Sequence, residues 1–270
     1  MKEFYFKEDN VYYRKNDFRS DRQTLVFIHG LSGSSSAWLK FEEKFKKKYN
    51  VLTYDLRGHG KSVKFKNYED YRAYKFVDDL NDLLEYLKIE KFVLISHSMG
   101  SLIALDFFSK YKEKVDKIVL LSPTFYIEKK WLDFILNKTT FRLAGFIDKL
   151  IKSPKKGGHV DYKKFINTGD WNIRRMIKDV SNTNLKIYLY GTKQYCHFDR
   201  RDFLKEIEVP VLIIHGKKDT IFPIKNSIKG AKEIKDSKMI ILEDTDHIIV
   251  LNNFQEVSEA VEDFTESLID

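Results

Sequence analysis

The chain has 270 residues, of which 43% are hydrophobic and 33% charged, and it carries a formal net charge of +8. This length suits one large α/β domain with an insertion better than two domains, and the composition excludes a disordered or fibrous chain. The single cysteine, Cys196, excludes an internal disulfide and fits a reducing compartment. Charges interrupt the N-terminal apolar residues, and no stretch reaches the ~18 apolar residues of a membrane helix. We therefore expect a soluble, cytoplasmic protein.

The positive charge lies in one segment of the chain. Residues 123–206 contain 18 Lys and Arg against 9 Asp and Glu, whereas the remaining residues contain 30 against 31. This distribution argues against a nucleic-acid partner, which would need a basic footprint together with a binding motif. It favours either contact with an acidic partner, such as an anionic lipid headgroup, an anionic ester or an acyl-carrier protein, or simply a solvated lysine-rich surface.

Short apolar runs and amphipathic stretches alternate along the chain. Residues 4–6 and 11–13 predict a hairpin or edge strands at the N-terminus. Buried strands are predicted at residues 24–28, 51–54, 92–95, 118–121, 211–214 and 239–242. Helices are predicted at about 36–48, 68–87, from 102 onward, 224–234 and 254–268. This alternation predicts a mostly parallel sheet with helices on both faces.

Residues 123–206 break the alternation of strands and helices. They contain aromatic, basic and helical stretches at 131–136, 141–151 and 171–180, separated by Pro154 and Gly157-Gly158. We interpret this segment as a helical cap, inserted into a core made of residues 1–122 and 207–270. A cap in this position is expected over the carboxyl ends of the strands, where such sheets bind ligands.

A serine occupies the turn between the strand at 92–95 and the following helix. The turn reads Ser96-His97-Ser98-Met99-Gly100. A tight strand-to-helix turn pushes its middle side chain out of the sheet and needs small residues two positions to either side. It also places that side chain at the positive end of the helix, which favours an oxyanion. Ser98 is therefore the candidate nucleophile, with a purely structural turn as the alternative.

A serine nucleophile needs a general base, and the base needs an orienting acid. Asp219 follows the strand at 211–214 and His247 follows the strand at 239–242, so both lie past the carboxyl ends of strands, as Ser98 does. The order Ser, Asp, His is that of a hydrolase triad. Asp244 and Asp246 remain alternative acids, although acids so close in sequence rarely reach the far ring nitrogen. The other histidines are expected at structural turns (His29, His59, His97 and His215) or on the cap, exposed or against substrate (His159 and His197).

The turn His29-Gly30-Leu31-Ser32-Gly33 follows the strand at 24–28. Glycines in such a turn let backbone N–H groups converge, and the N–H groups of Leu31 and Met99 are predicted to form an oxyanion hole. A glycine-rich turn can also bind phosphate or a dinucleotide, but this one lacks the third glycine and the Lys-Ser/Thr pair of those motifs.

Together these segments resemble the α/β-hydrolase superfamily over nearly the whole chain outside the cap. The sequence Asp55-Leu56-Arg57-Gly58-His59-Gly60-Lys61-Ser62 is similar to the family's Asp-x-Arg-Gly-x-Gly-x-Ser loop, and Ser122-Pro123 opens the cap. Ser96 replaces a common glycine. A serine at position 98 argues against haloalkane dehalogenases and epoxide hydrolases, which carry an aspartate nucleophile. The resemblance implies an α/β-hydrolase fold with an eight-stranded, mostly parallel sheet, and is closest to esterases, monoacylglycerol lipases and lysophospholipases.

The expected reaction is hydrolysis of a small-molecule carboxylic ester through an acyl-enzyme, which requires no metal or organic cofactor. Phe125, Tyr126 and Trp131 are the candidate substrate-binding residues. Further cap aromatics could line an acyl pocket or simply pack the cap on the core: Phe134, Phe141 and Phe146. The same triad could instead act on a thioester, an amide, a carbon–carbon bond or an acyl-carrier-protein ester, or carry out perhydrolysis. A non-catalytic binding protein on the same scaffold is the alternative of another class.

Overall fold

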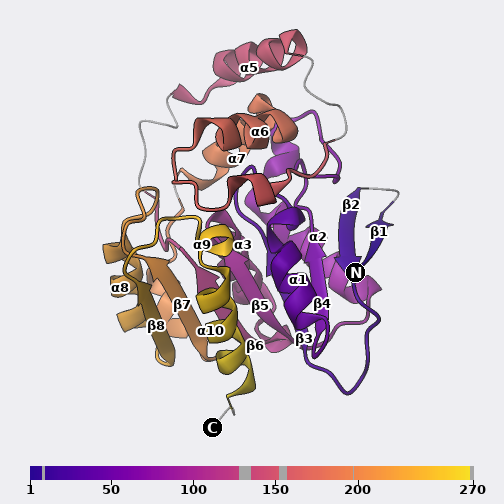
Figure 1. Cartoon of the computed structure of the whole chain (residues 1–270). Coiled ribbons are helices and arrows are strands. Elements are labelled where there is room, and N and C mark those ends of the chain that lie inside the picture. Colours follow the sequence, from indigo (N-terminus) through magenta and orange to yellow (C-terminus); the bar gives the residue numbers. More distant parts are fainter. Residues whose placement is uncertain (8–9, 128–134, 152–156, 197, 268–270) are drawn as a thin grey trace.

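The computed structural model describes residues 1–7, 10–127, 135–151, 157–196 and 198–267 (Figure 1). Its centre is one sheet with the strand order β1-β2-β4-β3-β5-β6-β7-β8. The strands are β1 (Lys2–Phe6), β2 (Val11–Lys15), β3 (Thr24–Ile28), β4 (Asn50–Tyr54), β5 (Phe92–His97), β6 (Val115–Leu121), β7 (Val211–Gly216) and β8 (Ser237–Leu242). The β1–β2 and β2–β4 pairs are antiparallel, and the pairs from β4 to β8 are parallel. The predicted eight-stranded, mostly parallel sheet is confirmed.

Helices cover both faces of the sheet, because alternate residues of each buried strand point to opposite sides. Val26 and Ile28 of β3 belong to one apolar cluster, and Leu25 and Phe27 belong to the other. The first cluster includes residues of α2 (Ala73–Tyr86) and α3 (Met99–Lys110) and is packed against α8 (Ile224–Glu233). The second includes residues of α1 (Leu39–Phe45), α9 (Ile249–Asn252) and α10 (Phe254–Glu266).

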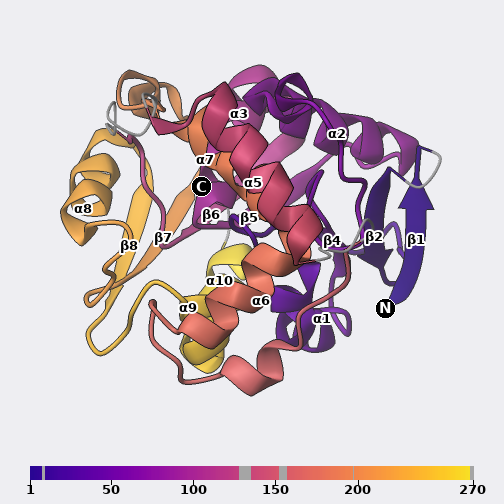
Figure 2. The same cartoon turned by 90° about the horizontal axis from the view of Figure 1, so that it is seen from above.

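Among the described residues, three α-helices lie between β6 and β7 in the sequence and over the sheet in space. They are α5 (Lys138–Leu150), α6 (Ile173–Thr183) and α7 (Leu185–Tyr195), and Figures 1 and 2 place them beyond the carboxyl ends of the parallel strands. The two ends of this segment meet, because Tyr126 and Asp199 form an isolated antiparallel bridge. We call residues 123–206 the cap segment.

The structure differs from the predicted helices in where they begin, end and divide: the helix predicted at about 36–48 is a 3₁₀ helix (Ser35–Trp38) followed by α1, and α3 begins at Met99. The predicted helix at 68–87 is split at Arg72, whose ψ of 140° is extended, into a 3₁₀ helix (Tyr68–Tyr71) and α2. Helix α7 follows α6 directly and was not predicted. The two helices are separated by Asn184, which has a left-handed φ of 78°, and no Gly or Pro marks this boundary in the sequence. The other 3₁₀ helices are Lys112–Lys114, Tyr162–Phe165 and Asp202–Glu206. Within the described residues, no helix is long and apolar enough to span a bilayer.

Candidate active site

Ser98 lies at the tip of the turn between β5 and α3, with φ 55° and ψ −124°. This left-handed conformation is strained for a residue with a side chain and persists only where close packing enforces it. Close packing is found at Gly30, across from Ser98, and at Gly100, in the turn itself. A Cβ at Gly30 would lie 3.1 Å from the Ser98 Cβ, and a Cβ at Gly100 would lie 2.7 Å from the carbonyl oxygens of Ile28 and His29. The glycine at position 100 is therefore required by the turn.

Ser96, which replaces the common glycine of this turn, is accommodated inside the sheet. Its side chain is fully buried, and its hydroxyl lies 3.3 Å from the carbonyl oxygen of Val119 and 3.4 Å from the Ser101 hydroxyl. A buried hydroxyl with a carbonyl acceptor costs little. The turn therefore keeps its geometry with serine at this position.

The three predicted triad residues meet at the carboxyl end of the sheet. His247 Nε2 lies 2.7 Å from Ser98 Oγ, and His247 Nδ1 lies 2.7 Å from Asp219 Oδ2. The two alternative acids are engaged elsewhere: Asp244 pairs with Lys218 at 2.9 Å, and Asp246 accepts the Ile248 N–H at 2.9 Å. Asp219 is therefore the carboxylate that orients the His247 ring.

Asp219 is held ionised by the groups around it. Its Oδ1 accepts the backbone N–H groups of Ile221 and Phe222, each at 2.8 Å. Its Oδ2 also lies 3.0 Å from Nε2 of the buried His215. Burial would raise the pKa of Asp219, but the hydrogen bonds with His215 and His247 hold that pKa well below its ordinary value. An ionised Asp219 favours the His247 tautomer with the proton on Nδ1, which leaves Nε2 free to accept the Ser98 proton.

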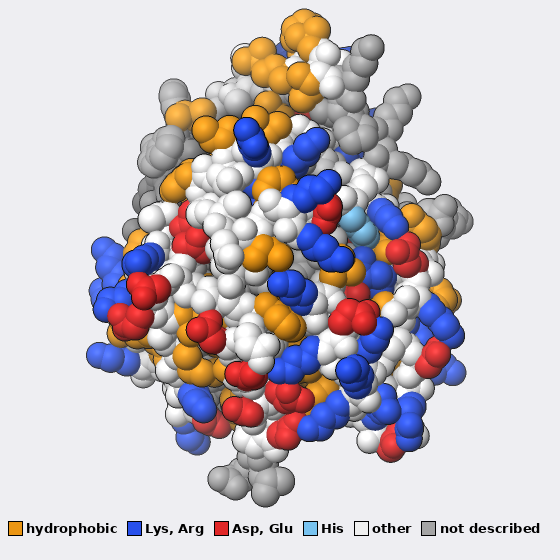
Figure 3. Space-filling view, in the orientation of Figure 1, with side chains coloured by type: hydrophobic (Ala, Val, Ile, Leu, Met, Phe, Trp, Pro, Cys, Tyr) orange, Lys and Arg blue, Asp and Glu red, His pale blue; other side chains and the backbone are white. Residues whose placement is uncertain are grey.

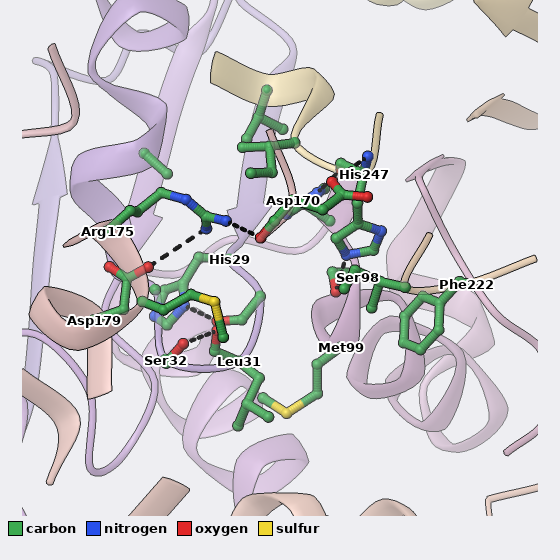
Figure 4. Close-up of a pocket in the computed structure, with 18 of the residues that line it drawn as sticks. His29, Leu31, Ser32, Ser98, Met99, Asp170, Arg175, Asp179, Phe222 and His247 are labelled. Atoms are coloured by element: carbon green, nitrogen blue, oxygen red, sulfur yellow. Dashed lines mark hydrogen bonds and ion pairs between the residues drawn. The ribbon is translucent and has the colours of Figure 1, made fainter. Parts of the chain in front are cut away.

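The main chain of His247 is held by hydrogen bonds at both its carbonyl oxygen and its N–H group. The Nε2–H of His97 donates to the His247 carbonyl oxygen at 2.9 Å, and burial lowers the pKa of His97 to about 3, so this ring is neutral. On the other side, the His247 N–H donates to Asp170 Oδ1 at 2.8 Å (Figure 4). The imidazole is thus positioned through its main chain as well as through Asp219.

Asp170 is a buried carboxylate from the cap segment that joins two loops of the core. Besides the His247 N–H, it accepts the Thr220 N–H at 2.9 Å and the Thr220 hydroxyl at 2.6 Å, both on Oδ2. Thr220 is the residue after Asp219, so one carboxylate ties the loop that carries the acid to the loop that carries the base. Sequence reasoning missed this residue, because nothing in its local pattern separates it from a surface aspartate.

The two predicted oxyanion-hole residues border the same cavity as Ser98. Met99 is the first residue of α3, where backbone N–H groups have no partner within the helix. Leu31 follows Gly30 in a turn that is fixed by His29, whose Nδ1 donates to the Gly30 carbonyl oxygen at 2.8 Å and whose Nε2 accepts the Leu56 N–H at 3.0 Å. Figure 4 shows Met99 next to Ser98, and Leu31 next to Ser32 on the neighbouring turn.

The cavity above Ser98 has a volume of about 360 Å³ and is lined by both the core and the cap segment. Most of its wall is apolar, including Leu102, Ile127, Met176, Val180, Phe222 and Ile248. Two charged residues of the wall lie on α6. There the Arg175 guanidinium donates to the Asp170 carbonyl oxygen at 2.6 Å and lies 3.6 Å from Asp179, the pKa of which burial raises to about 6.

The predicted substrate contacts need correction. Phe125 and Tyr126 do not border this cavity. The chain leaving β6 runs toward α8 instead, where a Cβ at Gly230 would lie 2.1 Å from the Phe125 ring and the Tyr126 hydroxyl donates to Asn226 at 2.8 Å. Phe146 is exposed, and Phe141 packs on other aromatic rings. Trp131, Phe134 and His197 lie outside the described residues.

The loop that starts at Asp55 has a structural role and contacts the cap segment. Asp55 accepts the N–H groups of Ser35 and Lys61, each at 2.7 Å, and pairs with His159 at 2.8 Å. Although burial opposes ionisation, the contact with His159 lowers the pKa of Asp55 to about 2. Gly60 packs so closely on this carboxylate that a Cβ would lie 2.1 Å from Oδ2. The predicted role of His159, on the surface or against substrate, is therefore replaced by a contact between core and cap segment.

Comparison with known proteins agrees with this fold. The model of the family described as the alpha/beta hydrolase fold matches residues 23–254. The chain belongs to the α/β hydrolase fold family.

Two similar proteins in this comparison are enzymes. The chain is 28% identical over 246 residues to the pimeloyl-[acyl-carrier protein] methyl ester esterase of Wigglesworthia glossinidia brevipalpis, covering 85% of this chain and 88% of that one. It is 23% identical over 251 residues to the (E)-2-((N-methylformamido)methylene)succinate hydrolase of Acinetobacter baylyi, covering 92% of each.

Solved structures in the family share the architecture. One of them is MGS-M2, an alpha/beta hydrolase enzyme from a Medee basin deep-sea metagenome library. The TM-score is 0.79 at 22% identity, and the match covers 100% of this chain and 99% of that one. At this identity the likeness shows the common fold.

Proposed function

We propose that this α/β hydrolase is a serine hydrolase that cleaves carboxylic esters through an acyl-enzyme on Ser98. The observation that carries the proposal is the continuous hydrogen-bonded chain from Ser98 through His247 to the ionised Asp219, which opens on a mostly apolar cavity. A strained serine beside a correctly oriented base is the arrangement that nucleophilic acyl transfer needs.

The first step of the proposed reaction forms the acyl-enzyme. Ser98 Oγ attacks the ester carbonyl carbon while its proton passes to His247 Nε2. The oxyanion accepts hydrogen bonds from the N–H groups of Leu31 and Met99, and each such donor contributes a factor of about 10²–10³ in rate by analogy with measured oxyanion holes. His247 then gives its proton to the leaving alkoxide, which departs as an alcohol.

The second step reverses the roles with water. His247 Nε2 takes a proton from water, the hydroxide attacks the acyl carbonyl, and the proton returns to Ser98 Oγ as the carboxylic acid leaves. Asp219 stays ionised throughout and stabilises the imidazolium that forms in each half of the cycle. The reaction therefore consumes one ester and one water and yields one acid and one alcohol.

The cavity supports an apolar acyl group of modest size. A volume of about 360 Å³ is at the lower end of the range for small-molecule sites, and its wall is mostly aliphatic and aromatic. We therefore expect short and medium acyl esters to be better substrates than long ones.

The test is hydrolysis of a p-nitrophenyl ester series from acetate to palmitate. Wild type should show turnover that falls for the longest chains, Ser98→Ala should show none, and Ser109→Ala, an exposed serine on the same helix α3, should match wild type. Turnover that survives in Ser98→Ala would refute the assignment of the nucleophile.

A further inference from the structure

Helix α5 carries apolar residues on two opposite sides. Phe141, Ala144 and Asp148 are buried on one side, and Leu143, Phe146 and Leu150 are each more than half exposed. Each exposed residue lies two positions after a buried one. At about 100° of rotation per residue, this offset places the exposed residues on the opposite side of the helix. Because the buried side packs on α7, the exposed apolar side faces away from the molecule.

Helix α6 also has one side that lines the cavity and another that is exposed. Arg175, Met176, Asp179 and Val180 line the cavity above Ser98, whereas Ile173 and Ile177 are each more than half exposed. Figures 1 and 2 place α5 and α6 together on the side of the molecule that faces away from the sheet. Figure 3 shows apolar side chains gathered over α5 at the top of the molecule. We call Leu143, Phe146, Leu150, Ile173 and Ile177 the outer cap face.

The exposed charged residues of helices α5 and α6 are all basic. The structure describes every residue of α5 and α6, and their exposed charged residues are Lys138, Arg142, Lys149, Arg174 and Lys178. Their two acids, Asp148 and Asp179, are buried, where Asp148 accepts backbone N–H groups of α7 and Asp179 faces the cavity. An apolar stripe flanked by cations on the same helix is the composition of a helix that lies in the headgroup region of an anionic membrane.

We propose that the outer cap face docks on an anionic lipid surface. The exposed Leu, Phe and Ile side chains would enter the boundary between headgroups and acyl chains while the flanking Lys and Arg pair with lipid phosphates or carboxylates. A second copy of this chain fits the face poorly, because a twofold contact would bring the same cations together. An acidic protein would satisfy the cations but leaves the aliphatic stripe without a matching partner.

In this orientation, helix α6 lies between the lipid surface and the cavity. Its outer side faces the lipid, and its inner side lines the space above Ser98. The docking itself does not depend on the proposed reaction, so it can be tested on a chain that lacks the nucleophile.

The experiment is vesicle co-sedimentation of the full chain carrying Ser98→Ala, with phosphatidylcholine vesicles with and without added phosphatidylserine. We expect binding to the anionic vesicles that weakens with salt, and little binding to the neutral ones. Adding Phe146→Ser and Leu150→Ser should lower the partition coefficient by at least about tenfold. Replacing Arg142 and Lys149 by Glu should lower it by roughly fivefold or more for each basic residue lost.

Matched controls separate the outer cap face from general surface effects. Tyr74→Ser with Tyr86→Ser removes two exposed aromatic residues from α2, and Lys229→Glu with Lys232→Glu reverses two exposed charges on α8. Both control pairs should bind as the parent does. Variants of the outer cap face that retain Ser98 should keep the wild-type thermal unfolding midpoint and the wild-type hydrolysis of a soluble short ester, since the changed side chains are exposed.

Three results would overturn the proposal. The first is the absence of binding to anionic vesicles, and the second is binding that the outer-cap-face variants do not change. The third is evidence for another occupant in the absence of vesicle binding. A dimer that Phe146→Ser with Leu150→Ser converts to monomer would assign the face to a second copy of this chain. Binding to poly-glutamate would assign it to an acidic protein.

Discussion

Replacing Asp170 tests how far the cap segment positions the triad. The carboxylate accepts three hydrogen bonds, from the His247 N–H at 2.8 Å, the Thr220 N–H at 2.9 Å and the Thr220 hydroxyl at 2.6 Å. Asp170→Ala leaves the two backbone donors without this acceptor, and a buried donor left unsatisfied costs about 1–3 kcal/mol. If half to all of one such cost falls on the geometry of His247, kcat falls by a factor of roughly two to a hundred, since 1.4 kcal/mol corresponds to a factor of ten.

The assay separates positioning from general loss of structure. We would measure kcat and KM for p-nitrophenyl acetate, together with the thermal unfolding midpoint. Asp170→Ala should lower kcat with little change in KM, and Asp170→Asn, which keeps one acceptor oxygen, should retain more of it. Asp161→Ala is the control, because the contacts of this exposed side chain are local, with the Lys163 N–H and the Lys164 ammonium group in the cap segment. An unchanged kcat in Asp170→Ala, or a change confined to KM, would refute the reasoning.

Three further predictions concern single contacts. Asp219→Asn keeps the side-chain shape but favours the wrong His247 tautomer, so kcat should fall by about 10⁴, as measured in a serine protease triad, with KM nearly unchanged; a loss below tenfold would contradict this. Gly60→Ala, with φ 49° and a Cβ 2.1 Å from Asp55, should lower the unfolding midpoint by several degrees or prevent folding, whereas Gly169→Ala, which has open space around its Cβ, should not. The pKa of Asp55, about 2 in the folded protein and about 3.9 when unfolded, means that its stabilisation is present above pH ~4 and is lost as the pH falls toward 2. Unfolding midpoints measured from pH 5 down to pH 2 should therefore fall less in His159→Ala than in wild type, and equal slopes would contradict the contribution of this contact.

The sheet and the triad could be predicted because both depend on local pattern. Buried strands are short apolar runs, and parallel strands bring their carboxyl ends to one edge. Residues placed just after three such runs, Ser98, Asp219 and His247, therefore had to lie near one another. Even the replacement of glycine by Ser96 required only a nearby acceptor, which the neighbouring strand supplies.

The cap segment was less predictable, because its contacts depend on tertiary geometry. Phe125 and Tyr126 follow a strand end as the triad residues do, yet a bridge between Tyr126 and Asp199 directs the chain toward α8. Asp170 acts through distant loops, and the boundary between α6 and α7 is a left-handed asparagine rather than a glycine or proline. The proposed division into core and cap nevertheless rests on the same break in strand–helix alternation that the sequence displays.

The most direct test of the account is to treat the wild-type protein with a fluorophosphonate and map the adduct by mass spectrometry. An activated serine forms this adduct because a neighbouring base removes its proton, whereas ordinary serines do not react. The account predicts one stoichiometric adduct, on Ser98, that is lost in His247→Ala. An adduct on Ser98 without turnover of any p-nitrophenyl ester would mean that the triad is reactive toward another bond, such as a thioester or an amide. No adduct on Ser98, or an equal one in His247→Ala, would contradict the claim that Ser98 is the nucleophile of a serine hydrolase.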